Sequence, residues 1–217
     1  MYRREREVRT LQVSQTVRIA LTQAVKRLHQ RRWCDGTGGN FSVVVQKTPI
    51  MLLMAPSGVD KGCLKPEQLI VVGEDQQLID GIGKPSAETA LHIKIVDQTG
   101  AGAVLHTHSV SATVLSRYHL TSGSIPLQGW EMLKGLRGVN RHDVQIEVPV
   151  VANSQNMDEL KERFHPQLIH APYGILVAGH GLYAWGNDLQ EAQRHLEILE
   201  FLLEVQLQTQ RLGLPTP

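Results

Sequence analysis

The chain has 217 residues, 41% of them hydrophobic, and its 22 Lys and Arg nearly balance its 21 Asp and Glu. The balanced charge excludes a general electrostatic attraction to nucleic acid or anionic membranes, and no run approaches the roughly 18–20 apolar residues of a membrane span. We expect a single domain over residues 1–217. The arginine-rich start lacks the apolar core of a signal peptide (Arg3, Arg4, Arg6 and Arg9). With only two cysteines, the sequence predicts a cytoplasmic protein.

Hydrophobic periodicity predicts helices interspersed with strands. An apolar stripe at helical spacing indicates a helix over residues 11–28, and two β-branched or apolar runs, 41–45 and 50–54, read as a hairpin. Ser86 is the expected N-cap of a helix that stops at Gly100. Further strands are expected at 69–72, 103–108, 148–151 and 175–178, and further helices at 109–117, 158–164 and 188–208. This order predicts an α/β fold whose sheet is at least partly antiparallel, with helices on its faces.

Three histidines are candidate metal ligands. His106 and His108 end an apolar strand, where residues two apart point to the same face, so both can reach one ion at about 2.0–2.1 Å. A His-x-His pair alone is more often accidental, but His180 ends a second apolar strand between two glycines. Three histidines with an open fourth position are typical of catalytic zinc, although iron, manganese or cobalt can use the same donors.

Three short segments have the composition of anion-binding turns. They span residues 36–40, 55–58 and 84–87, and are rich in glycine, proline and hydroxyl side chains. Backbone N–H groups in such turns and at helix N-termini bind phosphate. Each segment alone is most often only a turn.

Two glutamates are candidate acid/base groups. Glu88 lies in the first turn of an expected helix, where capping alone favours an acid. Glu131 lies among apolar neighbours in residues 128–135. It is either a buried acid with a raised pKa or an exposed position on a short helix.

In this order, the motifs resemble the class II aldolase family, which includes sugar-phosphate aldolases, an epimerase and the adducin head domain. The motifs are Gly-Thr-Gly-Gly-Asn at 36–40, Ala-Pro-Ser-Gly at 55–58, Pro-Ser-Ala-Glu at 85–88, His-Thr-His at 106–108 and Gly-His-Gly at 179–181. The resemblance covers roughly residues 17–203. It implies a three-layer α/β/α fold with a central, mainly antiparallel sheet. It also implies one zinc per subunit on the three histidines, and a homotetramer with active sites at subunit interfaces.

The resemblance also implies a small phosphorylated sugar as substrate. The residues implied around its phosphate are Gly39, Asn40, Ser57, Gly58 and Ser86. The related aldolases have two serines where this chain has Ser86 and Ala87, so one hydroxyl contact is missing or replaced.

Two further motifs are similar to the dehydratases of the family rather than its aldolases. They are Glu-Met-Leu-Lys-Gly at 131–135 and His-Gly-Leu-Tyr-Ala-Trp-Gly at 180–186. This similarity implies Glu131 as the general acid/base, with a secondary role for Glu88. The alternative is an aldolase or epimerase with Glu88 as the base. A non-catalytic, adducin-like domain has no need for three histidines and two glutamates.

Overall fold

The computed structural model describes residues 13–214, so the predicted arginine-rich start and residues 11 and 12 of the first predicted helix lie outside the described part. The helices are α1 Gln15–Gln30, α2 Thr89–Thr99, α3 Val110–Tyr118, α4 Met157–Leu168 and α5 Leu189–Arg211, with the short 3-10 helices η1 Pro66–Gln68 and η2 Glu131–Gly135. The strands are β1 Asn40–Lys47, β2 Ile50–Met54, β3 Ile70–Gly73, β4 Leu78–Asp80, β5 Ala103–Thr107, β6 Ser124–Leu127, β7 Ile146–Val151, β8 Gly174–Val177 and β9 Gly181–Gly186.

The strands form a mixed sheet in the order β4-β3-β2-β1-β5-β9-β8-β7-β6. Neighbouring strands are antiparallel except β7 and β8, which are parallel. The predicted mainly antiparallel sheet is therefore confirmed. Strands β1, β5 and β9 lie at its centre, and they carry or adjoin the candidate metal ligands.

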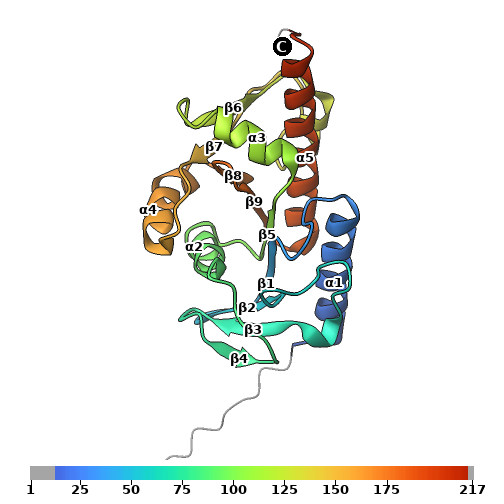
Figure 1. Cartoon of the computed structure of the whole chain (residues 1–217), viewed down its shortest axis with the longest axis vertical. Coiled ribbons are helices and arrows are strands. Elements are labelled where there is room, and N and C mark those ends of the chain that lie inside the picture. The colour runs from blue at the N-terminus through green and yellow to red at the C-terminus, as the bar shows by residue number, and fades with distance from the viewer. Residues whose placement is uncertain (1–12, 215–217) are drawn as a thin grey trace, which may run out of the picture.

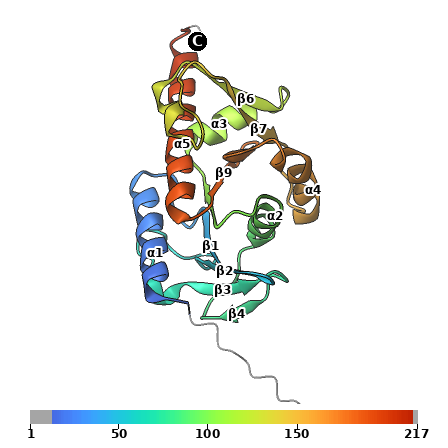
Figure 2. The same cartoon turned by 180° about the vertical axis from the view of Figure 1, so that it is seen from behind.

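Helices cover both faces of the sheet, with α1 and α5 on one side and α2 and α4 on the other (Figures 1 and 2). Alternate residues of β5 enter the two cores: Leu105 packs in the core that includes residues of α1, α3 and α5, and Val104 in the core that includes residues of α2 and α4. This arrangement confirms the predicted three-layer α/β/α fold. Between residues 13 and 214, no helix combines the length and apolar character needed to cross a membrane.

Three strands were not predicted: β4, β6 and β9. All six residues of β9 are buried, so the strand lacks the alternation that marks a half-buried strand. Pro126 interrupts β6, which lies at the edge of the sheet, where a missing N–H is tolerated. Strand β4 is short and fully exposed at the opposite edge.

Candidate metal centre and active site

The three predicted metal ligands lie together at one end of the central strands. His106 is in β5, His108 directly follows it, and His180 lies in the turn between β8 and β9. Nε2 of His106 lies 2.8 Å from Nε2 of His108 and 3.3 Å from Nε2 of His180. Glu88 joins them, with its Oε1 3.1 Å from Nε2 of His180. The four groups place their ligand atoms within 4.8 Å of one another, an arrangement that can hold a metal ion.

The chemistry of the imidazoles fits a bound cation. Nδ1 of His106 lies 2.9 Å from the carbonyl oxygen of Leu182. A carbonyl only accepts, so Nδ1 carries the proton and Nε2 presents a lone pair to the other two rings. Burial lowers the pKa of His106 well below its usual value and also lowers the pKa of His108. Neutral imidazoles whose nitrogens converge in this way are suitable ligands for zinc or a similar ion.

Strand pairing explains how these side chains meet. His106 is opposite Asn40 of β1 on one side and opposite Tyr183 of β9 on the other. The Tyr183 ring stacks on the His106 ring, with centroids 3.8 Å apart and an interplanar angle of 9°. Sequence reasoning assigned Tyr183 no role of its own, although it stands three residues after His180 in the motif at 180–186. Its contact with His106 depends on the register of β5 and β9.

Glu88 is part of the cluster because it immediately precedes α2. Its carboxylate accepts a hydrogen bond from the side-chain amide of Asn40. Burial raises the pKa of Glu88, but the hydrogen bond with His180 and the three nearby imidazoles outweigh this effect and lower it to about 2. Glu88 is therefore a carboxylate at neutral pH, and it lies beside the predicted metal ligands.

The prediction that Ser86 caps this helix is wrong by two residues. Helix α2 begins at Thr89, and Glu88 occupies the N-cap position without a side-chain capping bond. A turn precedes the helix, with Thr89 N–H donating to the Ser86 carbonyl at 3.1 Å. The Ser86 hydroxyl accepts from the N–H of Glu88 at 3.3 Å, so it stabilises this turn.

The three predicted phosphate-binding segments also lie together. Asn40 links the first segment to Glu88, and the N–H of Ser57 donates to the Lys84 carbonyl at 2.9 Å, which joins the other two. Ser57 and the neighbouring Gly58 are exposed. Asn40 is opposite His106 in the sheet, so this group of turns adjoins the histidine cluster. Phosphate binding by these residues stays a prediction.

Gly39 shows why this corner of the sheet requires glycine. Its φ is +79°, and a Cβ at this position would lie 2.7 Å from the carbonyl oxygen of His106. The absence of a side chain therefore allows the first turn to pack directly against the strand that carries His106.

Glu131 is not part of the cluster that the three histidines and Glu88 form in the single chain. Its side chain is 71% exposed and forms ion pairs with Lys134 and His142. The hydrogen bond and charge of Lys134 lower the pKa of Glu131, so the single chain matches the exposed alternative and not the buried acid with a raised pKa. In η2, Leu133 is the residue that enters the core, whereas Glu131 and Met132 face outward. An acid/base role for Glu131 stays a prediction.

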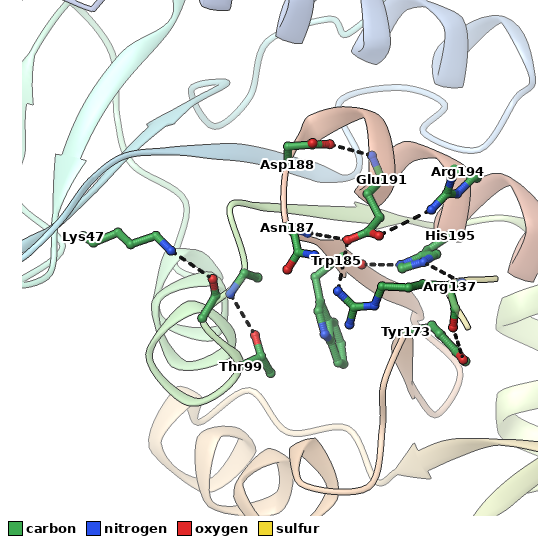
Figure 3. Close-up of polar contacts among 12 residues, drawn as sticks. Lys47, Thr99, Arg137, Tyr173, Trp185, Asn187, Asp188, Glu191, Arg194 and His195 are labelled. Atoms are coloured by element: carbon green, nitrogen blue, oxygen red, sulfur yellow. Dashed lines mark hydrogen bonds and ion pairs between the residues drawn. The ribbon is translucent and has the colours of Figure 1, made fainter. Parts of the chain in front are cut away.

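The segment that follows Glu131 is firmly anchored (Figure 3). The N–H of Arg137 donates to Nε2 of His195 at 3.3 Å, and the Tyr173 hydroxyl donates to the Arg137 carbonyl at 2.8 Å. The Arg137 guanidinium donates to Glu191 at 3.2 Å. Nδ1 of His195 lies 2.7 Å from the Trp185 carbonyl, so both ring nitrogens have partners. This network attaches Arg137 to α5 and to Tyr173, the residue directly before β8.

The comparisons with known proteins agree with the fold and with the candidate metal site. The model of the class II aldolase and adducin N-terminal domain matches residues 19–207. The chain belongs to this family. It is 42% identical over 192 residues to a methylthioribulose-1-phosphate dehydratase from Pectobacterium carotovorum subsp. carotovorum (strain PC1), covering 87% of this chain and 92% of the relative.

Other relatives and solved structures extend this result. The dehydratase of the same name from Xanthomonas campestris pv. campestris (strain 8004) is 40% identical over 193 residues, 88% of each chain. The structure of YgbL from Escherichia coli is 26% identical, with a TM-score of 0.76 over 90% of each chain. The L-fuculose-1-phosphate aldolase from Thermus thermophilus is 27% identical, with a TM-score of 0.72, covering 92% of this chain and 98% of that one.

Proposed function

We propose that this chain is a zinc-dependent dehydratase that converts 5-methylthioribulose 1-phosphate into 2,3-diketo-5-methylthiopentyl 1-phosphate in methionine salvage. The observation that carries the proposal is the 42% identity, over nearly the whole chain, to a relative named for this reaction. The geometry supports it with three imidazoles and a carboxylate beside the three turns that we expect to bind phosphate.

The reaction requires two proton transfers. The substrate has a ketone at C2, hydroxyls at C3 and C4, phosphate on C1 and a methylthio group on C5. Loss of the C3 proton and of the C4 hydroxyl, which leaves as water, forms a C3–C4 double bond, and the resulting enol tautomerises to the 2,3-diketone. His106, His108 and His180 would hold zinc, which would supply a Lewis acid to stabilise negative charge on the carbonyl oxygen.

Phosphate binding, proton transfer and orientation of the substrate are assigned to different residues of this chain. The turns that contain Gly39, Ser57 and Ser86, with Asn40 and Gly58, bind the C1 phosphate through N–H groups, hydroxyls and the Asn40 amide. We propose that Glu131 removes the C3 proton and protonates the leaving hydroxyl. Glu88, already beside the histidines, orients the substrate.

This division requires a neighbouring subunit, because Glu131 is exposed in the single chain. We propose a homotetramer in which each active site lies at a subunit interface. Supporting this, α3 presents a line of exposed apolar side chains four residues apart: Val110 at 73%, Val114 at 46% and Tyr118 at 74% exposure. Such a line marks a surface for association, and α3 begins two residues after His108.

Product analysis tests the reaction. The zinc-loaded protein is expected to convert methylthioribulose phosphate into a product that has lost one water, detected by mass spectrometry and by trapping of the diketone. The His108→Ala variant is the control for metal dependence. Two-carbon and three-carbon fragments in place of the dehydrated product would instead identify an aldolase. The position of Glu88 beside His180 is the observation that favours this second candidate.

The phosphate site predicts a selective loss of substrate binding. Ser57→Phe is expected to raise KM about tenfold or more, because bulk in this turn removes hydrogen bonds to a charged group. Zinc content should not change, since Ser57 is exposed and its N–H donates to the Lys84 carbonyl rather than to a histidine. Ser122→Phe, at another exposed turn, is the matched control. A parental KM in Ser57→Phe would show that the phosphate binds elsewhere.

A further inference from the structure

The segment that carries His106 and His108 is attached to α5 by side chains on its other face. The Thr107 hydroxyl donates to Oε1 of Glu200 at 2.5 Å. One turn further along α5, Glu204 accepts from the Ser111 hydroxyl. Thr107 and Ser111 thus bond to α5, whereas His106 and His108, on either side of Thr107, converge on the candidate metal site.

Burial of a carboxyl at this position makes the free energy of folding less favourable. Thr107 is fully buried and Glu200 is 2% exposed. Oε2 of Glu200 is buried without a hydrogen-bond partner, and burial raises the pKa of this carboxyl to about 7. Apolar side chains of similar size usually stabilise a core as well as, or better than, such a group. Fold stability therefore does not explain Glu200.

The third histidine is connected to the same scaffold. In α3, the Thr113 hydroxyl donates to the carbonyl oxygen of His180 at 3.1 Å. The Ser116 hydroxyl accepts from the N–H of Gly179 at 3.1 Å. Helix α3 follows His108 directly, with Ser109 as its N-cap, and its Ser111 hydroxyl donates to Glu204 of α5. The contacts of α5 with Thr107 and Ser111 therefore connect the segment of His106 and His108 to the helix that holds the His180 turn.

We propose that Glu200 is a positioning residue of the metal site: it holds Thr107, and so sets the orientation of His106 and His108 on either side of it. The proposal rests on the metal site of the proposed function. Partners behind metal ligands typically change metal affinity by about 10–100-fold when they are removed. Glu200 acts through the backbone of the ligand segment rather than by contact with an imidazole.

The test compares zinc affinity with the stability of the metal-free protein. The double variant Thr107→Val/Glu200→Leu removes both partners at once, so neither is left buried and unpaired. Glu200→Gln keeps an acceptor for Thr107. Thr209→Val is the matched control, because Thr209 is also buried but bonds only the Val205 carbonyl in its own helix. Zinc affinity is measured by competition with a chromophoric chelator, and unfolding by thermal melts after zinc removal.

We expect the double variant to bind zinc about 10–100-fold more weakly than the parent, with an unchanged or higher melting temperature when metal-free. Glu200→Gln and Thr209→Val should retain parental affinity. The isosteric single change Thr107→Val should also weaken zinc binding. It tests the proposal if the double variant does not fold. The proposal would be overturned if Thr107→Val, and the double variant where it folds, bound zinc as tightly as the parent. It would also be overturned if Thr209→Val lost as much zinc affinity as those variants. A parent protein without zinc affinity would instead refute the proposed metal site itself.

Discussion

Replacement of His108 by alanine is expected to reduce bound zinc from about one ion per chain, the count for one catalytic site, to nearly none, and to abolish turnover. Loss of one imidazole leaves two of the three protein ligands, too few for the typical zinc site. His108 is the best ligand to change because it is only partly buried, whereas His106 is fully buried and stacked on Tyr183. Zinc content is measured by plasma mass spectrometry on the purified protein.

The control separates metal loss from damage to the fold. His170→Ala changes an exposed histidine in the turn after α4, and it should keep both zinc and activity. Circular dichroism should show His108→Ala folded like the parent. Full zinc content in His108→Ala, or parental activity after exhaustive chelation, would contradict a metal centre at these histidines.

The sequence alone predicts the parts of this site that depend on local geometry. His106 and His108 meet because residues two apart on a strand share a face, and this rule needs no knowledge of the fold. His180 was identified from the apolar strand before it and the glycines around it. The structure brings all three together, although their metal ligation itself stays a prediction.

Contacts between distant segments could not be derived in the same way. Tyr183 stacks on His106 only because β5 and β9 pair in one particular register. Thr107 and Glu200 are 93 positions apart in the chain, and no pattern in either segment indicates which helix covers β5. The sequence also left the environment of Glu131 open between buried and exposed, because apolar neighbours in the sequence do not determine which side of a short helix faces the core.

Substitution of Glu131 is expected to cause a large loss of kcat, and substitution of Glu88 a smaller one. Glu131→Gln should lower kcat about 10²–10⁴-fold, the usual loss for a positioned acid/base group, with unchanged zinc content. Glu88→Gln should have a smaller effect on kcat. Glu162→Gln, at an exposed position of α4, is the matched control. Nearly full activity in Glu131→Gln, together with an inactive Glu88→Gln, would show that Glu88 is the base, as in the aldolase alternative.

Mixed assemblies test where Glu131 acts. Its side chain is 71% exposed, so the proposal requires it to serve the histidine cluster of a neighbouring subunit. Co-expression of Glu131→Gln with His108→Ala subunits, each inactive alone, then combines intact histidines from one subunit with an intact Glu131 from another. Random mixing in a symmetric oligomer should complete about a quarter of the sites and restore activity in that proportion. If Glu131 served its own subunit, every site would lack one of the two groups and no activity would return. Recovered activity would therefore assign both the catalytic role of Glu131 and its place across the interface.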